Sequence, residues 1–222
     1  MMINHNVQAA VARDRQATLR AEAAAARRAR RAGPRRMATG PASTQAVLRD
    51  GSRVLIRQVQ SADAPLLADG FARLSAASRW MRFLTPKKEL TPAELRFLTD
   101  VDHRDHEALG ALDHRDGRGV GVARYVRQAD DPWSADVAVT IVDEWQGRGL
   151  GTELLARLSD RAREENIRSF TALVAAENVA VAGLLRNARA RLVGRESDTL
   201  EYEISLAPAA DQAQVPGVLL PR

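Results

Sequence analysis

Cysteine is absent from the 222-residue chain. This absence excludes a disulfide framework, a thiolate zinc site and catalysis through a cysteine nucleophile, and it favours a reducing, cytoplasmic location. The chain also lacks any apolar run near the roughly 20 residues that cross a bilayer. We therefore expect no membrane segment and no membrane partner, and the N-terminus shows no apolar core of a secretory signal.

Acidic residues are scarce in the first 45 residues, which contain nine arginines but only Asp14 and Glu22 as acids. That segment carries a charge of +7, and because the whole chain carries +5, the remainder carries −2. Alanine and arginine favour helix, yet the segment offers almost no apolar face to bury. We interpret residues 1–45 as a basic arm and linker. It is a solvated tail, a weak contact for nucleic acid or another acidic partner, or sequence upstream of a true start at Met37.

Residues 46–206 have the pattern of one mixed α/β domain. SRVLIRQV, at residues 52–59, alternates apolar and polar side chains as a half-buried strand does. We predict a helix from Ser61 over SADAPLLADGFARLSAASRWMRFL, with Ser61 or Asp63 as its cap. Its apolar side chains fall at helical spacing: Leu66, Leu67, Phe71 and Leu74.

A sharper helix start lies in TPAELRFL, where Thr91 is the cap, Pro92 takes the first helical position and Glu94 follows three residues after the cap. EALGAL and VGVARYVR then predict a hairpin. DVAVTIV is apolar on both faces, which indicates a central strand. The elements that follow are a helix, a strand, a short helix and two strands: TELLARLSDRAREENI, SFTALV, AVAGLLRNA, RLVGRE and TLEYEISL. We expect residues 207–222 to be a tail.

Three glycines separate DVAVTIV from the helix that follows, in QGRGLGT at residues 146–152. A Walker loop requires a lysine that is missing here, and a dinucleotide loop requires the spacing G-x-G-x-x-G. What remains is the general ability of main-chain N–H groups at a helix N-terminus to bind an anion. Gly147, Gly149 and Gly151 would let a pyrophosphate approach the main chain, and Arg148 would add charge. The alternative is an ordinary tight turn.

The pattern from Gln146 to Gly151 resembles the coenzyme A loop of the GCN5-related N-acetyltransferases (GNAT). The resemblance extends from about Val47 to Leu206. ARLSAASRWMRFL, KELTPAELRFLTDVD and AENVAVAGLLRNARARLVGRE resemble the acetyltransferase domain of bacterial Pat-type protein-lysine acetyltransferases. This resemblance implies a mixed, mostly antiparallel sheet that is splayed around acetyl-CoA and flanked by helices.

The resemblance also implies which residues bind acetyl-CoA. The pantetheine arm would bond to the main chain of the central strand, and the pyrophosphate would lie on the glycine loop. Asn178 matches the family asparagine near the cofactor, although it could instead cap the helix AVAGLL. The cofactor-binding residues expected on this basis are Ala138, Val139, Thr140, Gln146, Gly147, Arg148, Gly149, Leu150, Gly151, Thr152 and Asn178.

The expected chemistry is attack of an amine on a thioester, which requires a base. Pat-type domains place a glutamate at the head of the central strand, and the matching residue here is Asp136, which is one methylene shorter. A closer substrate or a relaying water would compensate. Leu185 occupies the position of the tyrosine that protonates the leaving thiolate in many relatives, so no general acid is evident.

For the remaining histidine, tryptophan and arginine residues of interest we expect no part in catalysis. The histidines at positions 103, 106 and 114 lack metal-ligand spacing, so no metal is expected. Trp145 is expected to pack beneath the glycine loop. Arg79 and Arg82 either border the acceptor cleft or lie on a solvated helix face.

The function expected from the resemblance is acetyl transfer from acetyl-CoA to a primary amine, with a protein lysine as the first acceptor. A small-molecule amine is the alternative acceptor, and an acidic pocket would favour a cationic one. A catalytically idle acyl-CoA sensor is the alternative from a different class of protein.

Overall fold

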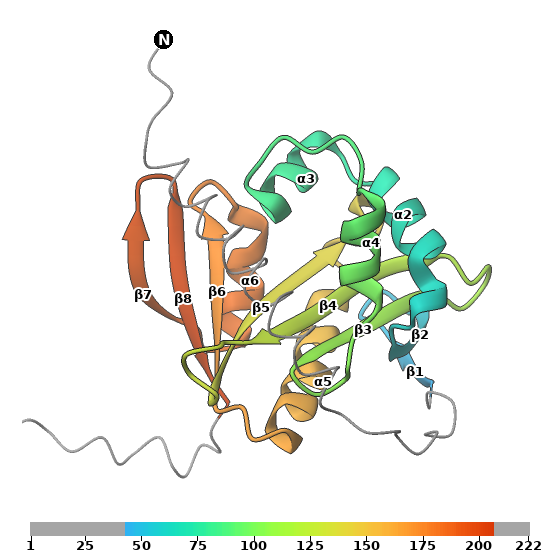
Figure 1. Cartoon of the computed structure of the whole chain (residues 1–222). Coiled ribbons are helices and arrows are strands. Elements are labelled where there is room, and N and C mark those ends of the chain that lie inside the picture. The colour runs from blue at the N-terminus through green and yellow to red at the C-terminus, as the bar shows by residue number, and fades with distance from the viewer. Residues whose placement is uncertain (1–42, 207–222) are drawn as a thin grey trace, which may run out of the picture.

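The computed structural model describes residues 43–206, which form an eight-stranded sheet with helices on both faces (Figure 1). The strands lie in the order β1-β2-β3-β4-β5-β6-β8-β7, and every neighbouring pair is antiparallel except β5 with β6. Apart from residues 43–45, the N-terminal arm lies outside the described residues, as does the tail at 207–222. The strands are β1 Thr44–Val47, β2 Arg53–Gln58, β3 His106–Asp113, β4 Gly119–Arg127, β5 Ser134–Ile141, β6 Ser169–Ala175, β7 Arg191–Glu196 and β8 Thr199–Ser205.

The helices divide between the two faces of the sheet. Figure 1 shows α2, α3 and α4 in front of the sheet and α5 behind it. Their bounds are α2 Ala64–Ala72, α3 Ala76–Phe83, α4 Pro92–Thr99, α5 Leu150–Glu164 and α6 Ala182–Asn187, with short 3₁₀ turns η1 Ser61–Asp63, η2 Asp143–Trp145 and η3 Val179–Val181. The described residues contain no helix that is both long and apolar enough to cross a membrane. The mixed α/β fold expected from the sequence is confirmed.

Helix α5 is held to the sheet by the apolar stripe that the sequence predicts. Leu154, Leu155, Leu158 and Ala162 are buried, and the helix contacts β3, β4 and β5. β4 makes room for it with a glycine. A Cβ at Gly121 would lie 2.7 Å from Ile141 Cδ1 and 3.2 Å from Leu150 Cδ2, which is closer than side chains pack. This close approach fixes the start of α5 against the strand β5.

Helix α4 begins where the sequence predicts. The Thr91 hydroxyl accepts a hydrogen bond from the Glu94 N–H at 3.2 Å, and the Glu94 carboxylate accepts one from the Thr91 N–H at 2.8 Å. Pro92 occupies the first turn. This reciprocal capping box satisfies donors that the helix itself cannot pair.

The single helix expected from Ser61 is wrong, because the segment forms two helices, α2 and α3. Ser75 interrupts them with extended backbone, and its hydroxyl accepts a hydrogen bond from the Ser78 N–H at 3.1 Å, which caps α3. Asp63 stands at the N-cap position of α2, as one of the two expected caps, but its side chain makes no cap bond to that helix. Its carboxylate accepts the Gln60 N–H at 2.8 Å and pairs with Arg57 at 2.6 Å. A serine cap inside a helical pattern outweighed the periodicity.

Candidate active site

The sheet opens between β5 and β6. These parallel strands pair only where Ser134–Asp136 meets Ser169–Thr171, although β5 continues to Ile141 and β6 to Ala175. Beyond Asp136 the two strands diverge (Figure 1). The edge of β5 from Val137 onward therefore faces no neighbouring strand on that side, and its main-chain groups can bind a ligand.

The alternation of the strand decides which main-chain groups face this opening. The Val142 N–H donates to Val120 O of the β4 side at 3.1 Å. Because successive residues of a strand direct their main-chain groups to opposite edges, those of Val137 and Val139 face away from β4. Of the three residues expected to bind pantetheine, Val139 thus presents its amide to the opening. Ala138 and Thr140 are paired with β4 and line a cavity on the α2–α4 side.

The glycine loop lies at the end of β5 and leads into α5. Gly147 has a φ of 74° and Gly149 a φ of 92°, a backbone region that side chains other than glycine rarely adopt. The first main-chain bond of α5 is made by the Glu153 N–H to Gly149 O at 3.1 Å. The N–H groups from Gly149 to Thr152 therefore lack partners within the helix, and this is the arrangement that binds anions.

The third glycine differs from the other two. Gly151 lies in the first turn of α5, and a Cβ there would meet Val139, Ile141 and Leu184 only at ordinary contact distances of 3.8–3.9 Å. Neither backbone conformation nor packing requires glycine at this position. Its neighbour Leu150 is 1% exposed, so only the main chain of Leu150 can contact a ligand, while the Thr152 hydroxyl accepts from Asn187 at 3.4 Å.

Gln146 connects the loop to the rest of the domain through its side chain. Its Nε2 donates to Ile141 O and Asp143 Oδ1, each at 3.1 Å, and to the Ser78 hydroxyl at 3.3 Å. Asp143 also accepts from the Ser75 N–H at 2.7 Å. Gln146 was expected to contact the cofactor, and these contacts show that its side-chain amide positions the loop against β5 and α3.

The guanidinium of Arg148 is bonded to other groups of the protein. Its guanidinium is 3.2 Å from Asp50 Oδ2 and donates to the Ser52 hydroxyl at 3.1 Å and to Glu144 O at 2.6 Å. It also lies 4.8 Å from the ring centre of Trp145, which is buried beneath the loop as expected. The guanidinium therefore acts as a brace between the loop and the β1–β2 turn.

Arg49, from the β1–β2 turn, approaches the same loop and was missed by sequence reasoning. Its N–H donates to Arg148 O at 3.3 Å. Its Cγ, Cδ and Nε lie 3.4 Å from the position that a Cβ on Gly149 would take. No ion pair with a described residue occupies its guanidinium. No local motif could have found it, because the contact joins segments about 100 positions apart.

Asp136 occupies the point at which β5 and β6 separate. It is exposed, and its Oδ1 accepts a hydrogen bond from Gln128 Nε2 at 2.8 Å. Asn178 follows β6 across the opening and makes no side-chain bond to the helix start at η3. The capping interpretation of Asn178 is therefore wrong, while the expected roles of Asp136 as base and Asn178 as cofactor contact stay predictions.

The remaining candidates have internal partners. His103 Nδ1 lies 2.8 Å from Glu107 Oε1, and His106 Nε2 lies 3.2 Å from Arg124 Nη1. These two histidines thus serve different partners. Arg79 does not lie on a solvated face, since it donates to Ala72 O and Lys88 O. Arg82, by contrast, lines the cavity, and Leu185 is buried in α6.

A central strand whose edge is released beyond a carboxylate, next to a glycine-rich loop at a helix start, is the arrangement that the resemblance to the GNAT family implies. The comparisons with known proteins agree with this class. The chain belongs to the GNAT family, because a family model described as "Acetyltransferase (GNAT) domain" matches residues 53–191. β1 and Arg49 precede the matched region.

Individual relatives show which members of the family the chain is similar to. The chain is 39% identical over 139 residues to acetyltransferase PA5475 of Pseudomonas aeruginosa, a match that covers 62% of this chain and 74% of the relative. It is 28% identical to acetyltransferase Pat of Mycolicibacterium smegmatis over 72% of this chain, and it spans only 48% of that relative. The crystal structure of the GNAT domain of S. lividans PAT superposes with a TM-score of 0.69 at 27% identity, covering 73% of this chain and 96% of that domain. The Pat-type resemblance is confirmed.

Proposed function

We propose that the protein transfers the acetyl group of acetyl-CoA to a primary amine. The observation that carries this proposal is the divergence of β5 from β6 beyond Asp136, next to the loop of Gly147 and Gly149. The diphosphate of acetyl-CoA would accept hydrogen bonds from the N–H groups at the start of α5, where the helix dipole also favours negative charge. Arg49 would add the cationic charge that the sequence assigned to Arg148.

The thioester would lie along β5. The pantetheine amides would bond to the main chain of Val139, which places the acetyl group near Val137 and Asp136. A main-chain N–H on this strand edge would stabilise the oxyanion. Asn178 would bind the cofactor from the β6 side of the opening.

Asp136 is the proposed base. A lysine-type amine with a pKa near 10.4 is neutral only about once in 10³ molecules at neutral pH, so its proton must be removed before attack. Asp136 would take this proton directly or through one water. The amine nitrogen then bonds to the acetyl carbon and loses its second proton to solvent, the C–S bond breaks, and coenzyme A leaves as the thiolate. Because Leu185 replaces the tyrosine of other relatives, the thiolate takes its proton from water or departs as the anion.

The likeness to Pat supports a protein lysine as the acceptor, and a small-molecule amine is the second candidate. The test is a thiol-release assay with acetyl-CoA against acetylatable proteins and small amines, together with calorimetry of acetyl-CoA binding. Release of coenzyme A that depends on an amine supports the proposal. Tight binding without turnover would identify an idle sensor module, and absence of binding would reject the proposed site altogether.

A further inference from the structure

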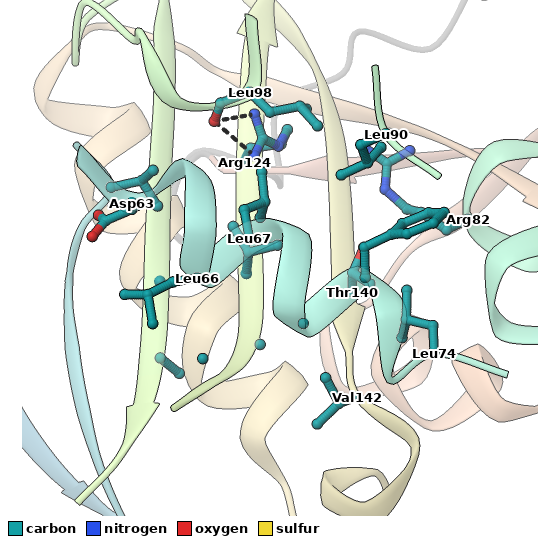
Figure 2. Close-up of a pocket in the computed structure, with 18 of the residues that line it drawn as sticks. Asp63, Leu66, Leu67, Leu74, Arg82, Leu90, Leu98, Arg124, Thr140 and Val142 are labelled. Atoms are coloured by element: carbon teal, nitrogen blue, oxygen red, sulfur yellow. Dashed lines mark hydrogen bonds between the residues drawn. The ribbon is translucent and has the colours of Figure 1, made fainter. Parts of the chain in front are cut away.

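A cavity of about 90 Å³ lies between helices α2–α4 and the face of strands β2–β5. Figure 2 shows most of the side chains that line it; the majority are apolar, and they come from both the helices and the strands. Its wall on β5 is formed by Ala138 and Thr140, the neighbours of Val139. The cavity is therefore next to the strand along which the thioester is proposed to lie, on the face of the sheet that α2, α3 and α4 cover.

Arg124 projects from β4 into this cavity and is 5% exposed. Both of its terminal nitrogens donate to Leu98 O at 3.1 Å (Figure 2). Nη1 also lies 3.2 Å from His106 Nε2. These bonds use three of its N–H hydrogens. Among residues 43–206, no partner is recorded for the edge formed by Nε and the second Nη2 hydrogen. That edge has the geometry that binds a carboxylate with two parallel hydrogen bonds.

The charged side chains that line the cavity are Arg57, Asp63, Arg82 and Arg124. Asp63 neutralises Arg57 at a distance of 2.6 Å. Arg124, by contrast, forms no ion pair with any of the residues that the structure describes. Burial and the nearby Arg82 lower the pKa of Arg124 to about 9, so it remains a cation at neutral pH. A buried cation without a carboxylate partner costs several kcal/mol in desolvation. Such a group in a cavity beside a reactive centre marks a ligand site.

We infer that this cavity binds the acyl acceptor, and that the acceptor is an amino acid or a similar small amine with a carboxylate and an apolar side chain. The carboxylate bonds to the Nε–Nη2 edge of Arg124. The apolar part lies against side chains of α2 (Leu66, Leu67 and Phe71), of α4 (Leu98) and of the segment just before α4 (Leu90). Arg124 pairs with Ala138, and Val126 pairs with Asp136. Arg124 and Asp136 therefore lie on the same face of neighbouring strands, offset by two residues along the strand. A ligand bound at Arg124 therefore lies on the same face of the sheet as the proposed base.

This inference rests on the proposed function and selects between its acceptors. A polyamine would place further positive charge beside Arg124, which is unfavourable at short range. A lysine side chain of a protein brings no anion to satisfy Arg124. An acidic pocket would have favoured a cationic acceptor, and this pocket is basic.

The test compares matched amines on the wild-type protein. L-leucine and L-phenylalanine are assayed for coenzyme A release against 3-methylbutylamine and 2-phenylethylamine, which lack only the carboxylate, and against an N-terminally blocked lysine peptide. A site built to bond a carboxylate rejects the analogue without it strongly. We expect kcat/KM for the amino acids to exceed that for the decarboxylated amines by about 100-fold or more.

Arg124→Gln should abolish most of this preference while leaving the Kd for acetyl-CoA within about twofold of wild type, the spread that about 0.4 kcal/mol produces. Arg168→Gln, at an exposed arginine stacked over Trp133, is the matched control and should change neither quantity. If Arg124→Gln does not fold, the wild-type comparison alone decides. Equal or better turnover of the decarboxylated amines or of the lysine peptide overturns the inference, as does acetyl-CoA binding without turnover of any amino acid. Failure to bind acetyl-CoA at all would instead reject the proposed function.

Discussion

Substitution of Gly149 by valine tests the anion loop most directly. The φ of 92° at this position forces a β-branched residue into a backbone region that costs about 1–3 kcal/mol. The new Cβ would also lie 3.4 Å from the Arg49 side chain. The loop must therefore shift, and its N–H groups would no longer converge on the diphosphate.

The expected loss of affinity for acetyl-CoA is set by the hydrogen bonds between the loop N–H groups and the diphosphate that the shift would break. A hydrogen bond to a charged group contributes about 1.5–3 kcal/mol, so loss of one such bond raises the Kd for acetyl-CoA by about 10- to 150-fold. Isothermal calorimetry measures this Kd, and urea unfolding measures the accompanying loss of stability. The variant should remain folded, because a domain of this size is usually stable by about 5–15 kcal/mol.

Gly117→Val provides the matched control. Gly117 has a φ of 72° in the β3–β4 hairpin, and a Cβ there would meet nothing within 4 Å. Its substitution should cost a similar amount of stability and leave the affinity for acetyl-CoA unchanged. If Gly149→Val bound acetyl-CoA as tightly as the wild type, or if Gly117→Val lost as much affinity, the loop would not be the diphosphate site.

Three further predictions concern single side chains. Asp136→Asn should lower kcat/KM by about 10²–10⁴-fold with an unchanged Kd for acetyl-CoA, and a wild-type rate at pH 7 would remove it as the base. Arg49→Ala should raise the Kd for acetyl-CoA by about 5- to 10-fold at low salt, with a smaller effect at high salt, and insensitivity at both would exclude a phosphate contact. Thr91→Ala should reduce the free energy of unfolding by about 1 kcal/mol through loss of the cap on α4, which denaturant titration would detect. The fourth concerns pH: the hydrogen bond from Arg57 lowers the pKa of Asp63 below its usual 3.8. The stability that this pair contributes should be complete at neutral pH and disappear as the pH falls through that lowered pKa, so the wild type should lose its advantage over Arg57→Gln only in acid.

Local patterns predicted the elements well and side-chain partners poorly. The start of α4 at Thr91 depends on residues within one turn, so the sequence contained all the necessary information. The interruption at Ser75 was missed because the same apolar spacing fits one long helix or two short ones. The hydrogen bond from the Gln146 side chain to Ser78 joins positions 68 residues apart, so no local pattern could predict it.

What the sequence by itself determined is the order of strands and helices, the glycine loop and membership of the GNAT class. Each of these depends on periodicity, capping or φ preference within a few neighbouring residues. Only the tertiary structure decided where β5 separates from β6, that Arg148 pairs with Asp50 while Arg49 has no ion pair among residues 43–206, and that Arg124 is buried in a cavity beside β5. These features depend on contacts between segments far apart in the chain, and burial and ion pairing arise only when those segments pack together.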